Sequence, residues 1–171
     1  NNKKVIEIEN IKIQIPFKSF FNDNFLIENL EVSTKSLKIK NLISFIRSFH
    51  NKPELFILEK AIKKGYLIAD IKLEFDSKGR IKDDFVINGF IKDTKLSTIK
   101  NYNFQKLDLI FKYTKDNLLL NDIAFSLNDL NFASENISIK KDDDNFLIKG
   151  NVNHKKLAIG KKNIDLFIKP F

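Results

Sequence analysis

The side chains that carry most enzyme chemistry are scarce in this chain. Its histidines, His50 and His154, lie far apart in the sequence, and no catalytic motif surrounds either of them. Cysteine is absent, which removes thiolate nucleophiles, thiolate metal sites and disulfide bonds. The five glycines are scattered and form no P-loop or dinucleotide-binding pattern. We therefore expect no catalytic residues and no cofactor, and we expect that the protein is not an enzyme.

An acidic run at Asp142, Asp143, Asp144 and Asn145 offers the oxygen ligands that calcium prefers. It lacks the spaced oxygens, the central glycine and the distal glutamate of a dedicated calcium loop. Polar clusters of this kind usually mark turns. We interpret the run as the tip of a hairpin and expect no metal site.

Apolar side chains are the most suggestive feature, since the chain has 17 phenylalanines and no tryptophan. Such side chains can fill a closed β core. They can equally line a slot for acyl chains, because hydrophobic contact has no preferred direction. Both interpretations use the same candidate residues, which alternate along three segments: Ile71, Leu73, Phe75, Leu107, Leu109, Phe111, Ile123, Phe125 and Leu127.

Alternation of apolar and polar residues predicts the strands that must position this lining. Between residues 67 and 76 every second residue is apolar, and Asp70, Lys72 and Glu74 fall on the opposite face. Turn-forming residues follow at 76–79, 114–117, 141–145 and 160–163. This spacing predicts an antiparallel meander of long strands.

A short phrase recurs at 122–125, 129–132 and 136–139: Asp or Asn, an apolar residue, any residue, then another apolar residue. On a helix, Phe125, Phe132 and Ile139 would form a second apolar stripe opposite the first, which is unfavourable. As strands, each apolar pair points one way. The Asp or Asn then serves as a turn or bulge residue.

Residues 42–62 have helical spacing instead, with Pro53 suited to the first turn of a second helix and Gly65 to a stop. We predict N-terminal strands over 1–39, a helical pair over 40–64 and the meander over 65–171, all in one domain. Two short helices cover only part of a long sheet. Either the sheet closes into a sandwich or barrel, or one apolar face remains as a groove.

The net charge of +8 would suit nucleic acid or an anionic surface. Only two basic residues are arginines, and the lysines are interleaved with acidic residues. We interpret them as a solvated mixed face and expect no nucleic-acid partner. No apolar run approaches the ~20 residues that span a bilayer. The chain has no methionine, and its first residues already belong to a patterned stretch. We therefore expect it to be a segment of a longer protein.

Residues 53–97 resemble the AsmA-like proteins of Gram-negative bacteria, in their YhdP-type form, which are relatives of the bridge-like lipid-transfer proteins. Three stretches carry the resemblance: "GYLIAD" opening a long strand at Gly65, "NGFIKD" at Asn88, and "LLNDIAFSLNDL" from Leu119. The likeness extends from about Leu37 to the end of the chain, and strands that begin with Asn and an apolar residue are typical of it.

The resemblance implies a sheet curled into an open, taco-like groove whose apolar floor carries phospholipid between the inner and outer membranes during outer-membrane biogenesis. It also implies a periplasmic location and an inner-membrane anchor helix that lies outside this segment. Phospholipid acyl chains would be the ligand and the candidate lining given above would contact them. Other parts of the protein, outside this segment, would contact the membranes. The resemblance does not indicate which envelope proteins would be partners.

We therefore predict a mainly β fold with a short helical pair, curled into a lipid-binding groove of an AsmA-like envelope protein. A second hypothesis is an adhesin-like or structural β module that binds protein through its edge strands and has no lipid ligand. A third is a basic nucleic-acid-binding domain, whose binding would weaken steeply with salt.

Overall fold

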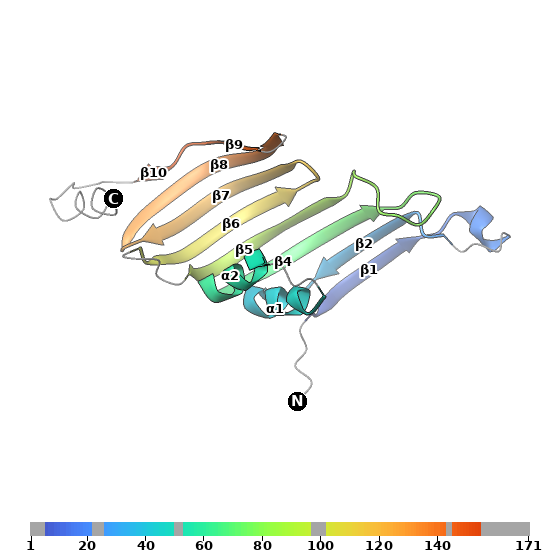
Figure 1. Cartoon of the computed structure of the whole chain (residues 1–171), viewed down its shortest axis with the longest axis horizontal. Coiled ribbons are helices and arrows are strands. Elements are labelled where there is room, and N and C mark those ends of the chain that lie inside the picture. Colours follow the sequence, from blue (N-terminus) through green and yellow to red (C-terminus); the bar gives the residue numbers. More distant parts are fainter. Residues whose placement is uncertain (1–5, 22–25, 50–52, 97–101, 143–144, 155–171) are drawn as a thin grey trace, which may run out of the picture.

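Strands dominate the computed structural model, which describes residues 6–21, 26–49, 53–96, 102–142 and 145–154 (Figure 1). One antiparallel sheet contains ten strands. They are β1 (Ile8–Gln14), β2 (Asn29–Thr34), β3 (Leu37–Lys38), β4 (Ile62–Glu74), β5 (Val86–Leu96), β6 (Phe104–Tyr113), β7 (Asn117–Leu127), β8 (Leu130–Asp142), β9 (Asn145–Gly150) and β10 (Asn153–His154). The helices of the described residues are η1 (Phe17–Phe20), α1 (Ile39–Phe49) and α2 (Pro53–Ala61).

The sheet is an open meander. Its strand order is β1-β2-β4-β5-β6-β7-β8, with β3 paired to β4 and both β9 and β10 paired to β8. The sheet does not close into a barrel. The predicted fold class, mainly β with a helical pair and a long antiparallel meander, is therefore confirmed. Of the alternatives left open by the sequence, an open sheet is the one observed.

The alternation in the sequence becomes a continuous apolar row across the sheet. Side chains that face each other in paired antiparallel strands lie on the same face. One row of paired residues crosses eight strands, and every member of it is apolar or aromatic: Ile11, Val32, Ile71, Ile87, Tyr113, Leu118, Ile139 and Ile148. We call the side of the sheet that carries this row the apolar face.

The neighbouring row, one residue along each strand, points the other way and is mostly polar. Its members are Asn10, Ser33, Asp70, Asn88, Lys112, Leu119, Ser138 and Lys149. We call this side the polar face. A shift of register by one residue would exchange the two faces completely, so this pattern specifies the pairing strongly.

The helices pack on the apolar face at one end of β4 and β5. Ile39 and Ile43 of α1 form a buried cluster with Ile62, the first residue of β4. Four half-buried residues pack against this cluster: Leu55 of α2, Leu67 of β4, and Ile91 and Leu96 of β5. Leu67 and Ile91 are paired on the apolar face. The predicted helical pair is thus present and covers part of one face (Figure 1).

The end of the helical pair differs from the prediction. We expected helix through residue 64 and a stop at Gly65, but α2 ends at Ala61 and β4 begins at Ile62. Ile62 pairs with Leu96, and two irregularities follow before regular pairing resumes at Tyr66. Gly65 has a φ of 153° and lies against Ile39 and Thr94. Its role is close packing under α1, which outweighs its tendency to end a helix.

The recurring Asp or Asn phrase has three different outcomes. Asn128 and Asp129 form the two-residue turn between β7 and β8, with φ angles of 49° and 67°. Asp122 also has a positive φ, 49°, at an irregularity in the pairing of β7 with β6. Asn136 instead lies within β8, opposite Asn121. The predicted turn or bulge therefore holds for two of the three copies.

The predicted turns at 76–79 and 114–117 are present. Asp76 Oδ1 accepts hydrogen bonds from the backbone N–H groups of Lys78 and Arg80, at 2.8 and 3.0 Å. Thr114 N–H donates to the carbonyl of Asn117 at 2.9 Å. The turn at 160–163 lies outside the described residues, as do His50 and the middle of the acidic run, residues 143–144.

Candidate functional site

The uncovered part of the apolar face is the candidate site. The helix contacts fall on β3, β4 and β5. Among the described residues, no second sheet lies over the strands from β6 to β9. Side chains of the apolar row accordingly stay partly open to solvent, and Ile148 at the far edge is 64% exposed. An extended apolar surface of this kind usually marks a binding site.

The candidate lining from the sequence gathers on this face. Ile71 belongs to the apolar row, and Leu73 pairs with Leu30. Leu109 and Phe111 pair with Ile91 and Gly89. Phe75 follows directly after β4, where it bridges to Ile81 in the next loop.

The remaining candidates lie beyond irregularities in β6 and β7, yet they share the same face. Asp108 pairs with Ala124 on the polar face. Since neighbouring residues in a strand point opposite ways, Leu107 and Leu109 lie on the apolar face, and so do Ile123 and Phe125. Leu127 pairs with both Phe104 and Leu130. Of the whole predicted lining, only Leu109 and Ile123 are buried.

A ladder of stacked rings crosses the end of the sheet opposite the β4–β5 loop. Phe104 of β6 stacks on Phe125 of β7 with ring centroids 4.7 Å apart, and Phe125 stacks on Phe132 of β8 at 5.2 Å. His154 of β10 continues the ladder, 5.1 Å from Phe132. The rings belong to four strands, so the ladder joins the inner strands to the edge.

Phe125 belongs to the lining predicted from the sequence, whereas the other rings of this ladder were not predicted. Phe125 and Phe132 could have been paired in advance, because a two-residue turn at 128–129 sets them opposite each other. The position of His154 depends on a pairing between β8 and β10 that no local pattern predicts. An open hollow of about 590 Å³ lies beside the ladder, lined in part by Ile123, Phe132 and Asn153.

A glycine keeps the middle of the apolar face smooth. Gly89 of β5 pairs with Phe111 of β6, and a methyl group at residue 89 would lie 2.9 Å from Cζ of Phe111. The missing side chain therefore lets the phenyl ring lie over β5. The ring therefore covers the glycine and keeps this part of the face apolar.

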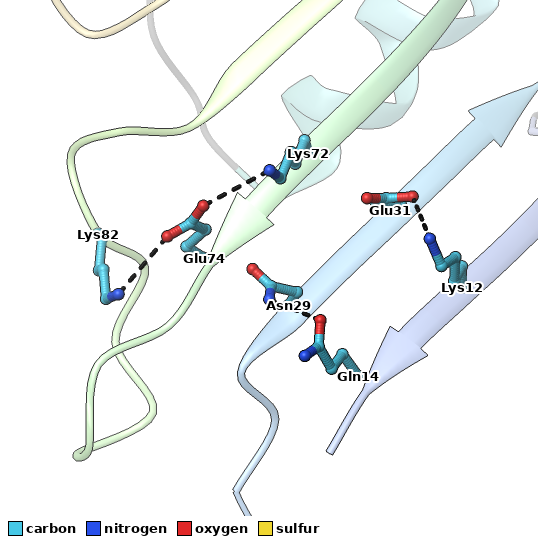
Figure 2. A network of polar contacts seen from close by, with 7 residues as sticks. All are labelled: Lys12, Gln14, Asn29, Glu31, Lys72, Glu74 and Lys82. Carbon is cyan, nitrogen blue, oxygen red and sulfur yellow. Dashed lines mark hydrogen bonds and ion pairs between the residues drawn. The ribbon is translucent and has the colours of Figure 1, made fainter. Parts of the chain in front are cut away.

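The polar face is solvated and carries compensating charges, as the mixed lysine and acid pattern predicts. Figure 2 shows Lys12 of β1 beside Glu31 of β2 at 3.3 Å, and Asn29 donating to Gln14 at 3.0 Å. Glu74 of β4 lies between two lysines, 3.6 Å from Lys72 and 3.5 Å from Lys82. Exposed pairs of this kind contribute little to stability.

One apolar patch interrupts the polar face. Ile68, Phe90 and Ile110 are paired across β4, β5 and β6 on that side. Phe90 is 42% exposed and Ile110 is 47% exposed. The sequence analysis did not identify this patch, because each of its members occupies a position where alternation places a polar residue.

Most of the ion pairs lie on the exposed surface, and one, between Arg47 of α1 and Glu59 of α2, is partly buried. The hydrogen bond and charge of Lys64 lower the pKa of Asp93, and Asp93 raises the pKa of Lys64 in return. Within the described ranges, no group of His, Asp and Glu side chains is placed to hold a metal ion. In the same part of the chain, no helix combines the length and the apolar character needed to span a bilayer.

Comparison with protein-family models, with curated proteins and with solved structures finds no match to this chain. The geometry of the two faces is therefore the basis for assigning a function.

Proposed function

We propose that the uncovered apolar face holds the acyl chains of phospholipids. The single observation that supports this function is the apolar row, which continues across eight strands without a charged residue. Each Å² of apolar surface removed from water contributes about 25 cal/mol. Acyl chains can supply that cover without directional contacts, so they need no complementary pocket.

The dimensions of the row suit a lipid chain. Neighbouring strands lie about 4.8 Å apart, so a row across eight strands spans roughly 34 Å. One leaflet of a bilayer has a hydrocarbon thickness of ~15 Å, half of the ~30 Å core. An acyl chain laid across the strands would therefore fit along the row with room to move.

The resemblance to AsmA-like proteins supports a wider proposal, in which this chain is a segment of a periplasmic protein that carries phospholipid between the inner and outer membranes. In that proposal an N-terminal helix outside these residues anchors the protein in the inner membrane. No catalytic group is needed, because transfer along an apolar surface forms and breaks no covalent bond.

A second candidate function is a β module that binds protein through an edge strand. All seven residues of β1 are exposed, and β1 forms one edge of the sheet. Exposed edges are templates for pairing with another chain. This function would need the edge of the sheet, whereas lipid binding needs its face.

Adjacent residues of β6 provide the test. Phe111 lies on the apolar face and Ile110 on the polar face, so Phe111→Glu and Ile110→Glu place the same charge on opposite sides. The protein and both variants are purified from cells, and native mass spectrometry and lipid extraction measure the bound phospholipid. We expect phospholipid on the parent protein and on Ile110→Glu, and its loss from Phe111→Glu.

Circular dichroism of both variants controls for loss of the fold. Absence of phospholipid from the parent protein, or equal loss from both folded variants, would contradict lipid binding on the apolar face. Capture of a protein that is lost on proline substitution in β1 would favour the second function.

A further inference from the structure

Three phenylalanines lie at the tip of the β1–β2 hairpin, beyond Gln14, the last paired residue of β1. Phe17, Phe20 and Phe21 are 76%, 63% and 75% exposed. In Figure 1 this tip is the short blue helix η1 beyond the end of β1, away from α1 and α2. We call these three residues the phenylalanine tip.

At the tip, a polar side chain is buried and apolar side chains are exposed, which is the opposite of the usual arrangement in a folded protein. Its small polar residue, Ser19, is buried and donates through its hydroxyl to the carbonyl of Leu26 at 3.4 Å. Backbone bonds fix the turn, from Ser19 N–H to the Pro16 carbonyl at 2.9 Å and from Phe21 N–H to the Lys18 carbonyl at 3.2 Å. Because these bonds fix the turn, the buried serine and the exposed phenylalanine rings are features of its folded conformation.

The rings also contact one another. Phe17 lies 5.1 Å from Phe21 in an edge-to-face arrangement and 6.5 Å from Phe20, measured between centroids. Mutual contact orders the rings before any partner binds, which lowers the entropic cost of inserting them. Exposed rings at the end of a hairpin can enter a fluid layer, which needs no preformed complementary shape.

The positive charge of Lys18 at the tip favours a negatively charged partner. Lys18 lies between the phenylalanines and is exposed, and residues 15–21 contain no acidic side chain. Phe75 N–H donates to the Glu28 carbonyl at 2.9 Å, which places the β4–β5 loop beside the base of the hairpin. That loop carries Lys78 but has equal numbers of basic and acidic residues, so Lys18 is the cation on which the charge argument depends. Among the described residues, neither Lys18 nor Lys78 forms an ion pair. Exposed aromatic rings beside Lys18 match an interface of hydrocarbon and anionic headgroups.

We propose that the phenylalanine tip inserts into the surface of an anionic phospholipid bilayer, with Lys18 beside the headgroup phosphates. This membrane contact is separate from the binding of acyl chains on the apolar face, because none of its residues belongs to that face. It would hold the end of the sheet that carries the β4–β5 loop against the bilayer.

Tryptophan fluorescence tests insertion directly, because the chain contains no tryptophan. Phe20→Trp is mixed with vesicles of phosphatidylcholine containing a minority of phosphatidylglycerol. We expect its emission to shift to the blue as the ring leaves water. Phe49→Trp is the matched control, since Phe49 is 69% exposed on α1 at the other end of the sheet, and its emission should not change.

Vesicle flotation measures how much the phenylalanine tip contributes to membrane binding. Replacing Phe17, Phe20 and Phe21 by serine should lower the bound-to-free ratio at least about tenfold. The control with Phe45, Phe49 and Phe56 replaced by serine removes three exposed rings on α1 and α2 and should bind as the parent does. Lys18→Glu should weaken binding to the phosphatidylglycerol vesicles and leave binding to pure phosphatidylcholine unchanged.

The proposal is overturned if the parent does not float with vesicles, if tryptophan at position 20 stays in water, or if the tip variant binds like the control. It is also overturned if the tip variant loses self-association on size exclusion while vesicle binding persists, which would assign the tip to a second copy. The tip variant should still co-purify with phospholipid even though it no longer binds vesicles. That outcome would show that membrane contact by the tip and acyl-chain binding on the apolar face are separate properties.

Discussion

The apolar face has two regions that the same alternation produces, one under the helices and one without a helix above it. Under α1 and α2, Leu37 is 4% exposed and Ile62 is 6% exposed. On β9, at the far edge of the same face, Ile148 is 64% exposed. We call these the covered and uncovered regions. Alternation decides which side chains point together, and the two helices add cover at one end of that face.

This difference separates two roles for the same residue types. In the covered region, isoleucine and leucine stabilise the fold because they are removed from water on folding. In the uncovered region they remain available to a ligand. A sheet with one face covered at one end can therefore combine a small core with a binding surface, and substitutions can test that division.

The largest expected effect comes from shortening the same side chain in both regions. Ile62→Ala should lower the free energy of unfolding by about 2–5 kcal/mol, because it opens a cavity under α1. Ile139→Ala, on half-buried β8, should cost about 1 kcal/mol, since it removes little surface from a dry core. Urea unfolding measures both. Equal losses would show that the two regions are buried alike.

A glycine substitution tests how tightly α1 covers the sheet. A methyl group at Gly65 would lie 2.4 Å from Oγ1 of Thr94 and 2.9 Å from Cδ1 of Ile39. With its positive φ, Gly65→Ala should cost about 1–3 kcal/mol. Gly79→Ala is the control, because Gly79 also has a positive φ but nothing lies within 4 Å of the added methyl group. Thermal unfolding should show the larger loss at Gly65.

A stabilising substitution is expected beside that glycine. Thr94 is 2% exposed, and its hydroxyl has no hydrogen-bond partner among the described residues. Thr94→Val keeps the shape and removes a buried polar group, so the free energy of unfolding should rise by up to about 1 kcal/mol. Thr114→Val is the control, because the hydroxyl of Thr114 donates to Asn117. A loss at residue 94 would contradict tight apolar packing in the covered region.

The smallest effect concerns the exposed pair at the edge of the covered region. Because Lys64 lowers the pKa of Asp93, the pair's contribution to stability is complete above the ordinary aspartate pKa of 3.8. It is lost as the pH falls through the lowered pKa. Asp93→Asn should remove this acid dependence while keeping a residue that tolerates the φ of 56°. Carboxyl chemical shifts followed by NMR would measure the pKa, and an unshifted value would contradict the pairing.

The strands and the composition of the apolar face could be predicted because both depend on local pattern. Residues 69–75 alternate without interruption, so their secondary structure and their shared face follow from period two alone. The turn at Asn128 and Asp129 then sets Phe125 opposite Phe132. Pro53 marked the start of α2 for an equally local reason, its fixed φ and its missing N–H.

The features that could not be predicted depend on contacts between distant residues. Gly65 resembles a helix stop until α1 is seen to pack on it. The positive φ of Lys106 follows from the bulge against β7 and has no signal in its residue type. Whether the apolar face is covered depends on how far two helices reach, and the phenylalanines of the hairpin tip look like core residues in any count of composition.

The direction of the apolar row has a mechanical consequence. Antiparallel hydrogen bonds lie perpendicular to the strands, so the row does too. In the proposed function, a hydrocarbon tail moving along it would exchange one aliphatic or aromatic contact for the next at each strand, and it would meet no charged side chain in the row. The free energy of such a lipid would therefore change little from one strand to the next. Friction along the surface, and not a barrier to release, would set its speed.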